Sequence, residues 1–315
     1  MAQRPAAVVP LLRGHGPAPD RTIAGAVDAF LSQADLAATT CREYGKHLSR
    51  LATRLGADRP LATVTTDELE VAVTDLWGAT KPRTWNQRLA VIGSFLAFAR
   101  RRGWPMARAG DLTLNLDRRR VKVDRTRVPT SVELERFWAK QNVPLVVKVF
   151  TRLQYETAAR ATELLSADIA DLDMDNRRLR VTSKGGDVEW VYFQSGSARN
   201  LPRLLRGRTG GPLFVTRLRP GPARAPAAAD VCPTTGLVRV SYRRMAELVV
   251  AWSGWPTHTF RKAQLSHLGA KGYGDAALQT KSRHKSRRSL EPYVNVPDEL
   301  AAKITAETDP NQRRR

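Results

Sequence analysis

The sequence predicts a mainly α-helical chain of two domains, and three observations lead to that fold class. Its 315 residues suffice for two domains with separate cores. Apolar residues recur at three- and four-residue spacing through most of both halves, as in amphipathic helices. Between the halves, a basic stretch lacks this period. The segments expected in order are a disordered arm (1–20), a helical domain (21–104), a basic extended linker (105–128), a mostly helical domain with a small hairpin or sheet (129–297) and a tail helix with a basic end (298–315).

The first domain is predicted to be a compact bundle of four or five helices. Apolar residues at helical spacing mark two helices, over residues 23–31 and 44–55. A third helix is expected to begin at Thr65 or Thr66, because a threonine followed by acidic residues is a typical N-cap. A fourth carries a line of aromatic and aliphatic side chains over residues 85–99.

The second domain is predicted to begin with a helix at Ser131, followed by a long apolar segment over residues 143–173 that ends in a turn. Residues 177–193, RRLRVTSKGGDVEWVYF, contain two β-rich runs around Gly-Gly, which predicts a hairpin. The Pro-, Gly- and Ala-rich residues 217–236 are expected to form a loop. Three helical stretches follow, over residues 240–254, 256–272 and 274–284.

The charge balance favours a polyanionic partner. There are 52 Lys and Arg against 30 Asp and Glu, a formal net charge of +22, and neutralising phosphates releases their counterions. Only Cys41 and Cys232 are present, which excludes a disulfide framework or a four-cysteine zinc site and favours a reducing cytoplasm. No apolar run is long enough to span a membrane, so we expect a cytoplasmic protein without membrane contact.

Six residues, spread over more than a hundred positions, are candidates for a shared chemistry. Phosphodiester transfer without a metal needs cations that bind nonbridging oxygens, a nucleophile, and a proton donor for the leaving oxygen. Clusters of acidic metal ligands and Gly-rich phosphate loops are absent from the sequence, which disfavours two-metal nucleases and ATP-driven motors. The candidates are Arg160, Lys184, His258, Arg261, His284 and Tyr293.

Local patterns suggest how some of these side chains are held. Thr257 is expected to cap a helix, so that His258 and Arg261 project from an N-terminus that favours anions. Glu163, three residues after Arg160, is expected to hold that guanidinium.

In their order and spacing, these residues resemble the tyrosine recombinases, also called the phage integrase family. The family pattern is Arg, a hairpin Lys, His-x-x-Arg, His or Trp, and then Tyr. The separations here are 24 residues from Arg160 to Lys184, 23 from Arg261 to His284 and 9 from His284 to Tyr293. The resemblance covers about residues 22–308, although family members commonly have Leu-Gly before the second His, where this chain has Ser282-Arg283, and often a His at the position of Lys262.

The resemblance implies a SAM-like core-binding domain followed by a mixed α/β catalytic domain. It implies that Tyr293 attacks a DNA phosphodiester and forms a 3′-phosphotyrosyl link, with His258 taking its proton and Lys184 protonating the leaving oxygen. Arg160, Arg261 and His284 would stabilise the transition state. The neighbouring charges are interpreted as groups that bring a phosphate to Tyr293, and they are Lys281, Arg283, Lys285, Arg287 and Arg288.

The implied partner is double-stranded DNA with specific recombination sites, bound by a homotetramer that is a monomer or weak oligomer without DNA. An accessory DNA-bending or directionality factor is compatible with this scheme, and neither metal nor ATP is implied. Leu300 and Ile304 in the tail suit docking on a neighbouring protomer or on their own domain. Three alternatives remain open: a type IB topoisomerase, a hairpin telomere resolvase, and a DNA-binding protein of the same fold without catalysis.

Overall fold

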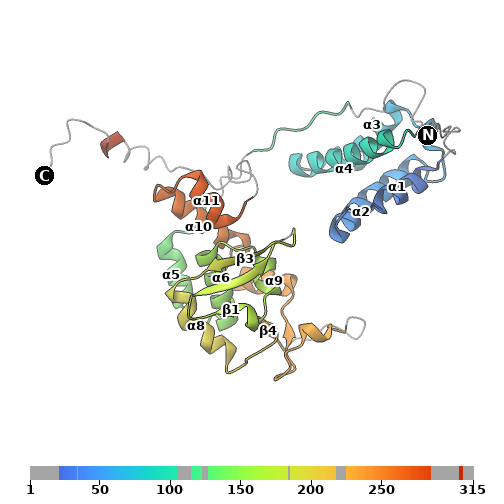
Figure 1. Cartoon of the computed structure of the whole chain (residues 1–315). Helices are drawn as coiled ribbons and strands as arrows, with labels where there is room; N and C mark the ends of the chain where they lie inside the picture. Colours follow the sequence, from blue (N-terminus) through green and yellow to red (C-terminus); the bar gives the residue numbers. More distant parts are fainter. Residues whose placement is uncertain are drawn as a thin grey trace, which may run out of the picture. The chain divides into compact units, whose positions relative to one another are not determined.

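The chain divides into two compact units, Met1–Lys122 and Val123–Arg315, and each is mainly helical (Figure 1). The structure is a computed structural model, and it describes residues 21–33, 35–104, 115–122, 127–183, 185–217, 225–284 and 305–307. Within these ranges, no helix combines the length and apolar character needed to cross a bilayer. The predicted fold class is confirmed.

Among the described residues of the first unit, four α-helices surround one apolar core. Thr22 caps the first helix by accepting from Gly25 N at 3.1 Å. The helix at Thr65 or Thr66 is confirmed: the Thr65 hydroxyl accepts from Glu68 N, and the Glu68 carboxylate accepts from Thr65 N. In the core, the ring of Phe30 packs edge-on against other aromatic rings. The elements are α1 (Ile23–Leu31), α2 (Ala38–Leu55), the 3₁₀ turn η1 (Leu61–Thr63), α3 (Thr66–Trp77) and α4 (Pro82–Arg101).

Residues 115–120, part of the predicted linker, are bound to the first unit. The amide of Asn86 donates to Arg119 O and accepts from Arg119 N, both at 2.8 Å. The guanidinium of Arg119 lies 4.1 Å from the centre of the Trp85 ring and donates to Thr80 O at 3.0 Å. The charge of Arg119 therefore stabilises the bundle itself.

The second unit combines seven α-helices with two small antiparallel sheets among its described residues. The predicted hairpin is confirmed, with Leu179 paired to Val191 across it. The helices are α5 (Ser131–Ala139), α6 (Leu145–Thr157), α7 (Ala161–Ser166), α8 (Ser195–Leu205), α9 (Tyr242–Ser253), α10 (His258–Ala270) and α11 (Asp275–Ser282). The strands are β1 (Leu172–Asp173), β2 (Arg178–Thr182) and β3 (Val188–Tyr192) in one sheet and β4 (Val215–Thr216) with β5 (Val238–Arg239) in the other, and the 3₁₀ turns are η2 (Ile169–Asp171) and η4 (Ala228–Asp230).

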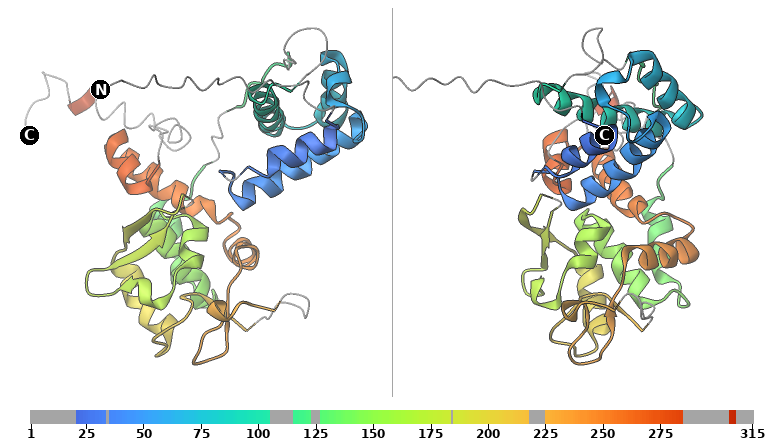
Figure 2. Two further views of the ribbon diagram at one scale, coloured as in Figure 1. Left: turned by 45° about the vertical axis from the view of Figure 1, so that its right-hand side comes forward. Right: turned by 90° about the vertical axis from the view of Figure 1, so that its right-hand side faces the viewer.

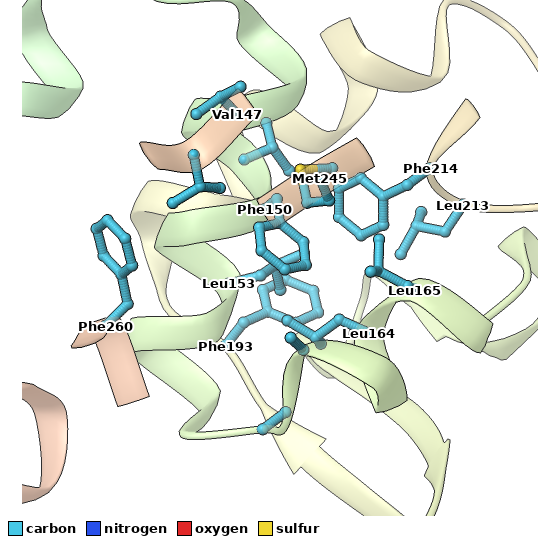
Figure 3. Packing of buried hydrophobic residues seen from close by; sticks show 14 of the residues in the cluster. Val147, Phe150, Leu153, Leu164, Leu165, Phe193, Leu213, Phe214, Met245 and Phe260 are labelled. Atoms are coloured by element: carbon cyan, nitrogen blue, oxygen red, sulfur yellow. The ribbon is translucent and has the colours of Figure 1, made fainter. Parts of the chain in front are cut away.

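The core of the second unit centres on α6. Phe150 on this helix meets Phe214 edge-on, and Leu153 belongs to the same cluster as Leu164 and Phe193 (Figure 3). Phe260 brings α10 into the same core. Helices α10 and α11 lie side by side (Figures 1 and 2). This packing gathers the end of α6, the start of α10 and the end of α11, segments distant in sequence.

Helix α8 was not predicted from the sequence, because it contains Pro202 and begins with small polar residues. Its first turn is stabilised from outside: Glu156 on α6 accepts from Gln194 N at 2.8 Å and from Ser197 N at 3.3 Å. Gly196 permits this close approach, since a Cβ there would lie 1.9 Å from Arg152 Nε. The helix thus depends on a tertiary contact that local periodicity does not reveal.

Candidate active site

Four of the six predicted site residues line one pocket of about 340 Å³ in the second unit. Arg160 directly precedes α7, His258 and Arg261 occupy the first turn of α10, and His284 follows α11. Residues in or next to the ends of three separate helices therefore converge. Lys184 and Tyr293 lie outside the described residues. The other lining residues are Gln154, Ala161, Thr162, Tyr242 and Thr257.

Arg160 is held by Glu163, as the spacing predicted. Its Nη1 donates to Glu163 Oε1 at 2.7 Å, and its backbone N donates to Oε2 at 2.8 Å. Burial raises the pKa of Glu163, but the donors from Arg160 and the nearby Arg283 outweigh it, so the pKa lies below its ordinary value. The carboxylate is 3% exposed while the Arg160 side chain remains 37% exposed, which leaves this guanidinium oriented but accessible.

Arg261 is almost completely buried, with 1% of its surface exposed. Its Nη1 donates to Ala158 O, and its Nη2 donates to Ser282 O at 2.6 Å and to His284 Nε2 at 3.2 Å. One guanidinium thus joins α10 to the end of α6 and to the end of α11 at the wall of the pocket. A planar fork of fixed donors suits this task better than an ammonium group.

The partners of His284 assign its tautomer. A guanidinium can only donate, so Nε2 of His284 accepts from Arg261. In the neutral ring Nδ1 then carries the proton and donates to Ser282 Oγ at 2.6 Å, and that hydroxyl donates in turn to Gln279 O at 3.3 Å. In this arrangement the imidazole of His284 accepts a hydrogen bond from the guanidinium of Arg261 and helps to orient it.

Both pocket histidines have depressed pKa values. Burial, followed by the charge of Arg261 and then Arg160, lowers the pKa of His284 to about 4. Burial also lowers the pKa of His258 below 6.5, with Arg261, Lys262 and Arg160 acting in the same direction. The imidazole of His258 is therefore neutral at pH 7 and able to accept a proton.

Thr257 occupies the N-cap position of α10, as predicted, but it does not cap the helix through its side chain. Thr257 has helical dihedral angles, φ −51° and ψ −42°, and its side chain forms no capping hydrogen bond. The chain turns already at Pro256, whose carbonyl accepts from Thr259 N at 3.0 Å. The Thr257 hydroxyl instead lies 3.4 Å from Tyr242 Oη. His258 and Arg261 still share the first turn of α10, as predicted.

Arg283 also differs from expectation. The sequence suggested a charge that contacts a phosphate, but its side chain is only 8% exposed. Its guanidinium is bound to Glu163 and, at 3.3 Å, to Glu189 on β3. Two carboxylates of the protein itself, the buried Glu163 and the partly exposed Glu189, hold this cation, so it is not presented to a ligand.

Sequence reasoning missed Gln154 and Tyr242 as pocket residues. Gln154 is 1% exposed, and neither its amide nitrogen nor its amide oxygen has a hydrogen-bond partner within the described part of the chain. The available signal was a polar side chain on the buried face of α6, where an apolar residue is expected. Tyr242 directly follows the α9 cap Ser241, and no local pattern relates it to the other site residues.

The described ranges contain no cluster of three or more His, Cys, Asp or Glu arranged to hold a metal ion. The cations among the described residues that line the pocket are the guanidinium groups of Arg160 and Arg261, and the imidazoles of His258 and His284 lie with them. Guanidinium groups held in the wall of a pocket, where the dielectric constant is low, bind a phosphate strongly. A neutral imidazole beside them can accept a proton.

Lowering the pH is expected to destabilise the protein through His284. The folded state keeps this ring neutral down to pH about 4, whereas in the unfolded chain it gains a proton near 6.5. The unfolded state therefore binds more protons between these values, and about 1–2 kcal/mol of stability is lost from pH 7 to pH 5. Thermal unfolding midpoints at the two pH values should fall less for His284→Gln, whose amide oxygen can still accept from Arg261. An equal fall in both proteins would contradict this origin of the effect, because His258 contributes to both.

Comparison with known proteins places these residues in a family context. Residues 130–299 match the Phage integrase family, and residues 27–103 match the phage integrase N-terminal SAM-like domain. Two proteins named tyrosine recombinase XerC, from Bifidobacterium longum and its subspecies infantis, are 29% identical over 151 residues, which is 46% of this chain. The aligned stretch spans 41% of the length of these curated relatives.

Solved structures share the fold. A lambda integrase dimer bound to a COC′ core site aligns with a TM-score of 0.64 over 87% of this chain and 95% of that one. A Tn1549 transposon integrase in complex with a circular intermediate DNA aligns with a TM-score of 0.65 over 90% of this chain and 98% of that one. Both are 14% identical to this chain, so these likenesses concern the fold alone.

Proposed function

Because the chain belongs to the phage integrase, or tyrosine recombinase, family, with a SAM-like N-terminal domain and a catalytic domain, we propose that it is a site-specific DNA recombinase. It cleaves and rejoins DNA through a 3′-phosphotyrosyl intermediate. The observation that carries this proposal is the convergence of Arg160, His258, Arg261 and His284 on one pocket, from positions up to 124 residues apart in the chain.

In the proposed cleavage step, the hydroxyl oxygen of Tyr293 attacks the phosphorus of a DNA phosphodiester. A bond forms between that oxygen and phosphorus while the bond from phosphorus to the 5′ oxygen breaks. His258, neutral at pH 7, accepts the tyrosine proton, and Lys184 donates a proton to the leaving 5′ oxygen. The product is a 3′-phosphotyrosyl link and a free 5′-hydroxyl.

Charge accumulates on the nonbridging oxygens in the transition state, and the pocket offers cations to meet it. Arg160 binds from the exposed side, held in direction by Glu163. Arg261 acts from the wall, where His284 and two carbonyl oxygens fix its plane. Because these donors are already oriented, they need little rearrangement when charge develops.

Strand exchange follows from the stored bond. The phosphotyrosyl link conserves the energy of the cleaved phosphodiester, so attack by a 5′-hydroxyl from a second strand regenerates DNA without ATP or a metal. We propose that four copies act on two DNA sites through a Holliday junction. Solved relatives bound to DNA support a duplex as the substrate, and the net charge of +22 supplies attraction to its phosphates.

The test is incubation with a nicked suicide DNA that carries sequence flanking the gene of this protein. Cleavage releases a short oligonucleotide, religation is prevented, and an SDS-resistant protein–DNA adduct accumulates. Unrelated DNA of equal length serves as the control and should give no adduct. Relaxation of a supercoiled plasmid that lacks such flanking sequence would favour a topoisomerase, and binding of flanking DNA without any adduct would favour a binding protein.

A further inference from the structure

Arg283 adopts a backbone conformation that glycine adopts more readily. It has φ 57° and ψ 39°, in the left-handed region, and it ends α11 with its N–H donating to Gln279 O at 2.7 Å. Glycine is common at such positions, because a Cβ disfavours this conformation. A favourable contact of the Arg283 side chain is therefore expected to offset the cost of this backbone conformation.

That contribution is visible in the ion pairs of the guanidinium. Its Nη2 binds Glu163 Oε2, and its Nη1 binds Glu189 Oε2 at 3.3 Å, with 8% of the side chain exposed. Glu163 is the same carboxylate whose Oε1 binds Arg160. A single buried glutamate is thus shared by a pocket arginine and by Arg283.

These contacts join three elements of the candidate site. Arg283 immediately precedes His284, so the end of α11 is tied through Glu163 to the start of α7, where Arg160 lies. Through Glu189 it is tied to β3, one strand of the hairpin whose turn contains Lys184 in the sequence. A planar guanidinium group that binds two carboxylates at once fixes the positions of the elements that carry them.

A left-handed arginine alone does not imply this role. Arg206 has nearly the same backbone angle, φ 52°, at the end of α8. Its side chain is exposed, and within the described residues it takes part in no ion pair. The two positions therefore differ in what the guanidinium contacts and not in backbone strain, which makes Arg206 a matched control.

We propose that Arg283 is a positioning residue for DNA cleavage: by binding Glu163 and Glu189 it sets Arg160, His284 and the hairpin in their working arrangement. This inference rests on the proposed function of the pocket. A glycine in its place would relax the backbone and yet lose the connection between the three elements. The predicted consequence is a slower chemical step with DNA binding retained.

The experiment compares Arg283→Gly, Arg283→Lys and Arg206→Gly in the full chain. At saturating suicide DNA, we expect the single-turnover rate of adduct formation to fall about tenfold or more for Arg283→Gly, with the Kd for DNA changed less than about threefold. Arg283→Lys should restore part of the rate, because one cation near Glu163 is kept. Arg206→Gly should match the wild type. An unchanged rate in Arg283→Gly, or a loss confined to Kd, would overturn the proposal.

Two further measurements separate this inference from the proposed function. Glu189→Gln should slow the wild type but add little to Arg283→Gly, because the two changes break one contact; additive effects would count against the proposal. Hydrogen exchange needs no activity: residues 158–166 and 178–192 should exchange faster in Arg283→Gly and not in Arg206→Gly. A wild type without adduct would refute the recombinase proposal, whereas unaltered exchange in Arg283→Gly would refute the positioning role.

Discussion

The Tyr293→Phe protein is expected to bind its DNA with unchanged affinity and to form no covalent adduct. Phenylalanine keeps the shape of the ring but lacks the hydroxyl oxygen that must bond to phosphorus, so no slower version of the same step is available. Loss of a nucleophile that is essential to the mechanism costs on the order of 10⁴-fold or more, which lies below detection in a gel assay. The measurement is the SDS-resistant band formed with suicide DNA, beside a binding titration of the same duplex.

The sharpest comparison is Tyr242→Phe, since Tyr242 lines the pocket and carries the only tyrosine hydroxyl among the described pocket residues. This change removes its contact with the Thr257 hydroxyl and should leave adduct formation detectable. Tyr273→Phe, at an exposed position after α10, serves as a second control. An adduct that persists in Tyr293→Phe and disappears in Tyr242→Phe would reverse the assignment of the nucleophile.

The parts of the fold that the sequence predicted are those determined locally. Helical periodicity located the bundle of the first unit, and the capping pattern at Thr65 was correct because it involves residues three positions apart. The hairpin around Gly-Gly follows from β-rich runs beside a turn. The Arg160–Glu163 pair was predicted for the same reason, as Arg160 is the N-cap of α7 and Glu163 lies three positions later in its first turn.

The remainder depends on contacts between distant residues. Helix α8 needs Glu156 from α6, and residues 115–120 need Asn86 on α4, and neither dependence leaves a periodic signal. Arg283 binds a glutamate 120 residues earlier. The basic run around Arg283 therefore could not reveal that its charge is bound inside the protein and does not contact a phosphate. In the site, the order of residue types predicted that Arg160, His258, Arg261 and His284 gather. It did not predict that His284 accepts from Arg261 or that Gln154 lies beside them.

The second large effect is expected for Arg261→Lys, which should lower the single-turnover rate of adduct formation by about 10²–10³-fold. The guanidinium donates at once to the carbonyls of Ala158 and Ser282 and to the ring of His284. An ammonium group keeps the charge but cannot hold this planar set of partners, so it would leave a buried carbonyl or the imidazole unsatisfied. Arg136→Lys, on the exposed face of α5, makes the same chemical change without such partners and should retain the wild-type rate.

Whether Arg261→Lys changes the Kd for DNA or the rate of adduct formation at saturating DNA distinguishes two roles for Arg261. If it only attracted DNA, lysine would substitute well, and any loss would appear in Kd and diminish at saturating DNA. If it stabilises the transition state from a fixed position, the loss persists at saturation, because charge alone does not replace orientation. A rate within about threefold of wild type at saturating DNA would rule out that second role, and with it the proposed contribution of His284 through Arg261.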